Sequence, residues 1–405
     1  MAELDKVTLH QARWVLSITR APLEGGAVAV RRKKIVAVGP MKILAREFHG
    51  PMIDHGDGVI LPALVNAHTH LELSGLRGGV NLNGSYVDWI RSVIREKERM
   101  DKKVLQKGLR DGIERLIKSG TGLVADISNT GRSIFPLKRS RLWAVVFLEA
   151  LGFNQKNNLL LLKSLLLRSK GLKRPIVTLG AHSPYTVSPH LFQKVHHWAH
   201  RNYPIISIHL AESKEELEFL KDGRGPIRDL LMERGNWNTG WTPSGLSPVA
   251  YLDRIGFLNS HTLGIHCVHL SDEDIEILKK RRVRICLCPN SNRNLRVGFP
   301  PVLKLLKAGL TVALGTDSLA SNEDLSIPEE MKAMARLNPM LSPEEVLKMA
   351  TIDGAKALGM ERVMGSIEEG KRANLIFLPV KIMNKKRVYE SVVMEGFKKE
   401  VRWIS

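Results

Sequence analysis

The alternation of apolar and polar positions divides the chain into three parts. Residues 1–58 hold short apolar or alternating runs broken by glycine- and proline-containing turns, a pattern typical of short β-strands. Between residues 59 and about 340, short apolar runs alternate with longer amphipathic stretches, which predicts strands followed by helices. Residues 374–378 and 390–394 are again short apolar runs, and they predict a return to strands near the C-terminus.

The central part predicts eight strand–helix units. Its strands are expected to end near His70, Asp126, Glu149, His182, His209, His266, Cys288 and Asp317. Helices are expected over residues 86–100, 102–119, 188–202 and 271–280. Eight such units are typical of a (β/α)8 barrel. We therefore predict an α/β fold, with a TIM-barrel domain over residues 59–364 and a small β-sandwich built from both termini, residues 1–58 and 365–405.

Polar side chains at the predicted strand ends carry the candidate chemistry. His68 and His70 are two residues apart on the first strand, so they point to the same side and can share one metal ion. Such a pair on its own usually has no metal-binding role. Here, however, His209, His266 and Asp317 end three further strands. Active sites of these barrels lie at the C-terminal strand ends. Three of these four histidines together with the aspartate would form a ligand set suited to Zn²⁺ or Fe²⁺.

Proton transfer needs a further group, and Glu212, three residues after His209, is the candidate for general acid–base catalysis. Taken alone, it would more often be a carboxylate that stabilises a helix start. His266 can hold the substrate at the attacked carbon, and Asp317 can bind metal and accept a proton from water. His182 and Glu149 end two further strands and are candidates for substrate binding.

The composition narrows the class of protein. The 405 residues are 43% hydrophobic and 25% charged, as in folded domains, and only three cysteines occur, which favours a reducing compartment and a cytoplasmic protein. The apolar run at residues 159–167 is too short to span a bilayer, so no membrane partner is expected. The net charge of +20 is read as a solvated basic surface; nucleic-acid binding is disfavoured, and an anionic substrate stays open.

Several motifs, taken in their order, resemble one superfamily. They are residues 66–72 (NAHTHLE), 181–188 (AHSPYTVS), 209–212 (HLAE), 266–269 (HCVH), 288–292 (CPNSN), 315–318 (GTDS) and 365–375 (GSIEEGKRANL). The chain is thereby similar to amidohydrolases of the metal-dependent deaminase and chlorohydrolase branch. The resemblance implies His68, His70, His209 and Asp317 as metal ligands, Glu212 as proton shuttle and His266 as a substrate contact. No lysine lies in residues 178–182, so one divalent ion, zinc or iron, is expected rather than a lysine-bridged pair.

Three segments, residues 72–78, 86–94 and 316–325, resemble aminodeoxyfutalosine deaminases of the alternative menaquinone pathway. The resemblance implies Glu72, Arg77, Trp89 and Ser318 as substrate-binding residues, with Arg77 as the cation for a benzoate. The expected reaction is hydrolysis of 6-amino-6-deoxyfutalosine, in which hydroxide attacks the amine-bearing ring carbon and ammonia leaves.

Other substrates and partners stay open at this point. Adenosine, S-adenosylhomocysteine and methylthioadenosine are alternatives, followed by guanine, triazines and cyclic amides. Residues 223–253 could form a lid or an oligomer contact, and a homo-oligomer is expected only by analogy. A binding protein on an inactive barrel is the rival of another class, and the full set of metal and proton-handling residues speaks against it.

Overall fold

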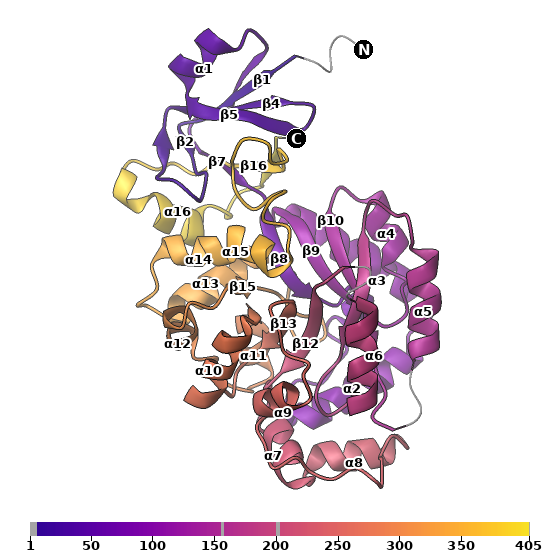
Figure 1. Ribbon diagram of the computed structural model, residues 1–405. Helices are drawn as coiled ribbons and strands as arrows, with labels where there is room; N and C mark the ends of the chain where they lie inside the picture. The colour runs from indigo at the N-terminus through magenta and orange to yellow at the C-terminus, as the bar shows by residue number, and fades with distance from the viewer. Residues whose placement is uncertain (1–5, 155–157, 200–202, 405) are drawn as a thin grey trace. The chain divides into compact units, whose positions relative to one another are not determined.

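The computed structural model describes residues 6–154, 158–199 and 203–404 (Figure 1). The last three residues of the helix expected over 188–202 lie outside the described residues. The chain splits into two compact units, and each is described by itself. One unit comprises Met1–Asn66, Leu116–Leu123 and Ser326–Ser405, and the other comprises Ala67–Arg115 and Val124–Leu325.

The first unit contains two small sheets built from both ends of the chain. One has the order β5-β4-β1-β6, with β1 Thr8–Gln11, β4 Gly26–Arg31, β5 Lys34–Pro40 and β6 Met52–Asp54. The other has the order β17-β16-β7-β2-β3, with β2 Trp14–Val15, β3 Leu23–Glu24, β7 Val59–Pro62, β16 Leu375–Leu378 and β17 Arg402–Trp403. Val15, Val28, Ile60 and Phe377 are buried in one apolar cluster that joins the two sheets. The predicted β-sandwich from both termini is therefore confirmed.

Two details of the prediction for this unit are wrong. Residues 390–394 were expected to form a strand, but they lie in helix α16 (Val388–Glu395). Val388, Val392 and Val393 are its buried positions, which is helical rather than alternating spacing. The barrel was expected to begin at residue 59, but residues 59–62 form β7, which pairs with β16 and β2 of the small sheet and is separate from the strand that carries His68. The remaining helices of this unit are α1 Met41–Glu47, α13 Ile327–Leu337, α14 Pro343–Met349, α15 Ile352–Ala357 and η3 Lys385–Arg387.

The eight predicted barrel strands are all present. They are β8 Leu64–Thr69, β9 Thr121–Ser128, β10 Trp143–Ala150, β11 Ile176–Ala181, β12 Ile206–Leu210, β13 Thr262–His266, β14 Arg284–Leu287 and β15 Val312–Leu314. They form the runs β8 to β11 and β12 to β15. The backbone N–H of His209 donates to the carbonyl of His182 at 2.9 Å, and Thr69 bridges Asp317, so contacts join the two runs at both edges. The C-terminal strand ends consequently meet at one rim.

Helices follow the barrel strands. They are η2 Leu71–Leu76, α2 Tyr86–Arg99, α3 Lys102–Lys118, α4 Ile134–Arg139, α5 Leu159–Arg168, α6 Pro189–Ala199, α7 Lys214–Asp222, α8 Pro226–Glu233, α9 Pro248–Arg254, α10 Asp272–Arg281, α11 Pro289–Asn294 and α12 Val302–Lys307. The capping box expected at Ser271 and Asp274 is present. None of the helices in the described part of the chain has the length and apolar character needed to cross a bilayer.

Candidate active site

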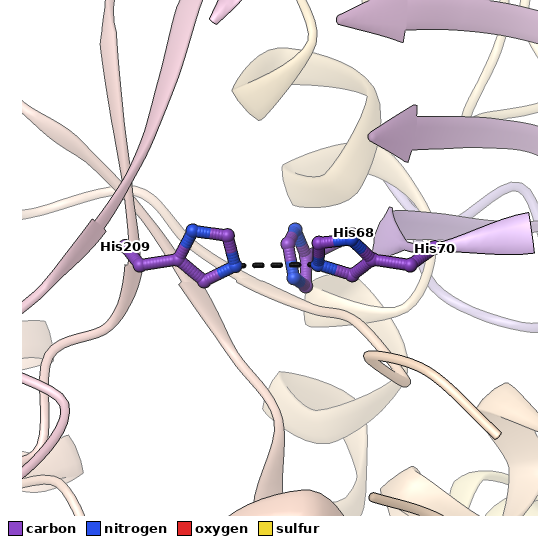
Figure 2. Close-up of side chains that lie close together, drawn as sticks. All are labelled: His68, His70 and His209. Atoms are coloured by element: carbon purple, nitrogen blue, oxygen red, sulfur yellow. Dashed lines mark hydrogen bonds between the residues drawn. The ribbon is translucent and has the colours of Figure 1, made fainter. Parts of the chain in front are cut away.

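Three histidines from the first and fifth barrel strands point toward one another (Figure 2). His68 lies in β8, His70 directly follows that strand, and His209 lies in β12. The Nε2 atoms of His70 and His209 are 3.3 Å apart, and all three rings are buried. Two segments about 140 residues apart in sequence therefore place three imidazole nitrogens around one point.

Asp317 completes this group as its fourth member. Its Oδ1 lies 3.5 Å from Nε2 of His68 and 3.5 Å from Nε2 of His70. Four donors with bonds of about 2.0–2.2 Å to a tetrahedral ion are separated by edges of about 3.3–3.6 Å. The spacing and chemistry of these side chains thus fit a divalent ion such as zinc or iron.

The atoms that do not face the common point are held by other groups. The carbonyl oxygen of His182 accepts a hydrogen bond of 2.9 Å from Nδ1 of His209. Nε2 of His209 is therefore the ring nitrogen that carries the lone pair for a metal. Oδ2 of Asp317 accepts from the hydroxyls of Ser291 at 2.7 Å and Ser321 at 2.6 Å. These contacts fix the orientation of two donors before any ion binds.

Burial sets the protonation of the donors. It lowers the pKa of His68 to about 3 and also lowers the pKa values of His70 and His209, so the imidazoles are neutral at physiological pH. Burial by itself would raise the pKa of Asp317, but the hydrogen bond with His68 and the interactions with His70 bring it well below its usual value. Neutral histidines and an ionised aspartate are the forms that bind metal.

Backbone strain gathers at the same strand ends. Ala211, His266, Cys267 and Asp317 all have φ between +50° and +68°, a region that residues other than glycine rarely adopt. The cost of such residues is of order 1–3 kcal/mol each, and they cluster at functional sites. Here the strain turns the chain so that the polar side chains face the rim of the barrel.

Glu212 is buried beside this group. Its Oε2 accepts a hydrogen bond of 2.7 Å from the hydroxyl of Tyr86, and its Oε1 lies 3.5 Å from Nε2 of His266. Burial raises the pKa of Glu212 to about 7, so both protonation states are accessible near neutral pH. The carboxylate of Glu216 accepts from the backbone N–H groups of Ala211 and Glu212 and thereby holds the turn.

His266 faces the same space from β13. The side-chain carbonyl of Asn292 can only accept, so Nδ1 of His266 donates to it at 2.8 Å. Nε2 of His266 therefore remains directed at Glu212. Sequence reasoning placed His266 correctly at the strand end but did not assign a role to Asn292.

A cavity of about 320 Å³ opens beside these residues. Of the residues expected at the site, it is lined by His70, Trp89, Glu149, His182, His209, Glu212, His266, Asp317 and Ser318. Leucine, isoleucine, valine and aromatic side chains make up much of the remaining wall. An apolar cavity with a few converging polar groups is typical of a small-molecule site.

Two residues expected to bind substrate do not line the cavity. Oε1 and Oε2 of Glu72 accept hydrogen bonds from Ser128, Thr130 and Arg132, so this carboxylate holds the loop after β9. Arg77 is exposed, and its Nε donates to the backbone carbonyl of Glu323 at 3.1 Å. The structure therefore places Glu72 and Arg77 outside the cavity, contrary to the sequence interpretation.

Other residues line the cavity without having been expected. Tyr86, Val93 and Lys97 share one face of α2 with Trp89, at helical spacings of three and four residues, and this periodicity was the available signal. Nζ of Lys97 donates to Oδ1 of Asn129, whose amide donates to Glu149 at 2.6 Å. A polar row thus runs from the metal donors outward to Lys97.

The tract at residues 223–253 forms a wall of the same cavity. Leu230 and Leu231 of α8, together with Arg234 and Asn236, line it. Phe219 stacks on Trp241 with ring centres 4.7 Å apart, which anchors the tract to α7. The structure thus places residues 230–236 of this tract in the wall of the cavity.

Comparison with known proteins agrees with this geometry. The model of the amidohydrolase family matches residues 59–397. A 5-methylthioadenosine/S-adenosylhomocysteine deaminase of Syntrophobacter fumaroxidans is 34% identical over 87% of this chain and 79% of its own length. The crystal structure of Helicobacter pylori aminofutalosine deaminase in complex with methylthio-coformycin has a TM-score of 0.86 and 30% identity, and the match covers 97% of each chain. A zinc-bound adenosine deaminase from Xanthomonas campestris has a TM-score of 0.82 at 25% identity, covering 97% of this chain and 89% of that structure.

The chain belongs to the amidohydrolase family, and it is a hydrolase that acts on carbon–nitrogen bonds. A triazine hydrolase variant, 19% identical with a TM-score of 0.82, shares the fold. The family, the barrel and the deaminase and chlorohydrolase branch predicted from the motifs are confirmed.

Proposed function

We propose that this protein is a hydrolytic deaminase of an adenine nucleoside. The observation that carries the proposal is the position of Glu212, whose free carboxylate oxygen lies 3.5 Å from His266 at the rim where the metal donors converge. The relatives named as deaminases of adenine nucleosides support the same reaction class.

A divalent ion held by His68, His70, His209 and Asp317 would lower the pKa of a bound water from about 15.7 towards 7. Glu212 then carries the proton to the ring nitrogen beside the amine-bearing carbon, because its pKa of about 7 allows it to accept and to donate. His266 lies near the carboxylate oxygen of Glu212 that Tyr86 does not bind, where it would contact the carbon that becomes tetrahedral. Zinc and iron both suit this donor set.

We further infer that the preferred substrate is 6-amino-6-deoxyfutalosine, an adenine nucleoside that bears a benzoate. The apolar wall made by α2 and α8 suits an aromatic ring, and Lys97 supplies a cation at the cavity, whereas Arg234 is paired with Glu98. Lys97 takes the role that the sequence interpretation gave to Arg77. This substrate would place the enzyme in menaquinone synthesis, which we expect in the cytoplasm, in keeping with three buried cysteines that form no disulfide.

The second candidate is deamination of methylthioadenosine or S-adenosylhomocysteine. Three curated relatives with this name, 31–34% identical to this chain, support it. Both candidates use the same metal donors and Glu212, and they differ only in the group that lies against Lys97.

The test is ammonia release by metal-loaded enzyme given 6-amino-6-deoxyfutalosine, adenosine, S-adenosylhomocysteine, methylthioadenosine and guanine. A clear preference in kcat/KM for the first supports the proposal. Preference for the sulfur-containing nucleosides replaces the substrate but keeps the reaction. Turnover of none of the five, with metal bound, overturns the deaminase assignment and favours triazines or cyclic amides.

A further inference from the structure

The basic charge of this protein is concentrated in one part of the sequence. Between Asp126 and Glu212 there are twelve Lys and Arg residues and one acidic residue, Glu149. Glu149 is buried in the cavity and cannot neutralise the surface. This segment therefore supplies more than half of the net charge of +20. It includes helices α4, α5 and α6 of the barrel.

Helix α5 is apolar on both sides, which is unusual at a surface. Its sequence, LLLLKSLLLR, has seven leucines in ten residues. Leu159, Leu162 and Leu166 are buried against the barrel. Leu160 and Leu167, on the opposite side of the helix, are 82% and 65% exposed. Helices that are apolar all round are normally covered, so this surface calls for a partner.

The exposed surface of α5 has neighbours in the loop before α4 and in α6. The loop before α4 approaches α5, since a Cβ at Gly131 would lie 3.0 Å from Leu165. Nζ of Lys163 on α5 lies 4.1 Å from the ring centre of Trp198 on α6. The two helices α5 and α6 also lie side by side in Figure 1. We call this surface, with its exposed apolar residues Phe135, Leu160, Leu161 and Leu167, the leucine face.

Four exposed cations lie on or next to two of the helices of the leucine face. Lys138 and Arg139 end α4, and Arg168 and Lys170 lie at the end of α5; all four are exposed. In the described part of the chain none of these four makes an ion pair with a carboxylate. None of them, and none of the exposed apolar residues, lines the cavity. The face is thus independent of catalysis.

We propose that the leucine face binds the surface of an anionic lipid bilayer. Basic side chains are attracted by anionic headgroups, while leucine and phenylalanine enter the boundary with the acyl chains. A second copy of this chain would bring the same cations into contact and be repelled. Nucleic acid would satisfy the cations but offers nothing comparable to cover the leucines. The contact is peripheral and agrees with the lack of a spanning helix in the described residues.

The test is sedimentation of the full-length, metal-loaded enzyme with vesicles of phosphatidylcholine, with or without phosphatidylserine. We expect binding to the anionic vesicles only, weakened by salt. Each basic residue at such a surface contributes about fivefold in affinity, so Lys138→Glu with Arg139→Glu should weaken binding by about 25-fold or more. Leu160→Ser with Leu167→Ser should weaken it by at least about tenfold.

The matched control is Lys279→Glu with Lys280→Glu on α10, which makes the same charge change on a different helix and should leave vesicle binding within about fivefold. All variants should retain turnover and melting temperature, which shows that they are folded. The proposal is overturned if wild-type enzyme ignores anionic vesicles, or if the control variant loses as much affinity as the α4 variant. Conversion of a dimer to a monomer by Leu160→Ser with Leu167→Ser would likewise overturn it, by showing that a second copy covers the face.

Discussion

The hydroxyl of Tyr86 donates a hydrogen bond of 2.7 Å to Oε2 of Glu212, which ties helix α2 of the cavity wall to the proposed acid–base residue. The bond fixes one carboxylate oxygen and leaves the other directed at His266. A hydrogen bond to a charged group is worth about 1.5–3 kcal/mol. Tyr86 is therefore a positioning residue, and its loss should affect turnover more than binding.

Replacement of Tyr86 by phenylalanine should lower kcat about tenfold or more, with a smaller change in KM. Steady-state kinetics on the best substrate would measure this. Tyr185→Phe is the matched control, since its hydroxyl lies 3.2 Å from that of Tyr86 and has no hydrogen bond to Glu212 in the described contacts. Equal losses in both variants would show that only packing is at stake.

Glu212→Gln should keep its metal and lose turnover by a factor of about 10²–10⁴, because the amide cannot carry a proton. The side chain is near the donors but is not one of the four that converge. Metal content by elemental analysis, measured beside kcat, separates the two roles. A metal-free Glu212→Gln protein would identify Glu212 as a ligand instead.

Ser291→Ala combined with Ser321→Ala should weaken metal binding by about 10–100-fold, because both hydroxyls hold Oδ2 of Asp317. The measurement is metal retained against a graded chelator. Ser318→Ala is the comparison: the Ser318 hydroxyl contacts Ser321 at 3.2 Å, with no hydrogen bond to Asp317 in the described contacts. Retention equal to wild type in the double variant would contradict the orienting role.

Asp126 should make stability depend on pH. Burial raises its pKa to about 8, whereas the unfolded carboxyl ionises near about 3.9. The folded chain then binds more protons between these values, so the free energy of unfolding falls as pH rises from about 4 to about 8. Asp126→Asn retains an oxygen for the N–H of Leu71 and cannot titrate. The melting temperature of wild type should therefore fall relative to that of the variant over this range, and parallel curves would refute the assignment.

The barrel and the convergence of its candidate metal donors could be predicted because each signal is local. Every strand is a short apolar run, and His68, His70, His209 and Asp317 lie at strand ends, which the fold brings to one rim. The cavity wall depends on contacts between distant segments. Glu72 is next to the histidines in sequence, but its carboxylate accepts a hydrogen bond from Ser128, more than fifty residues away, instead of facing the cavity.

The helical periodicity of α2 could have predicted further residues of the cavity wall. Trp89 was assigned to the substrate, but positions 86, 93 and 97 on the same face of α2 were not. The prediction of a strand over residues 390–394 was wrong for a related reason. Valine favours strands in isolation, yet the buried positions of α16 follow helical spacing, so tertiary packing decided the outcome.

Lys97 and Arg77 are the two candidates for the cation that binds the substrate carboxylate. The position of Lys97 in the structure favours Lys97, whereas the sequence interpretation favoured Arg77. Nζ of Lys97 lies at the cavity beside Asn129, whereas Arg77 is exposed and bound to the carbonyl of Glu323. With 6-amino-6-deoxyfutalosine, Lys97→Ala should raise KM about tenfold or more, the loss expected for one charge-assisted hydrogen bond. Arg77→Ala should leave KM unchanged. Adenosine, which has no carboxylate, should respond weakly to either change. A rise in KM with Arg77→Ala alone would return the carboxylate site to Arg77, and equal effects of Lys97→Ala on both substrates would show that Lys97 contacts the shared nucleoside.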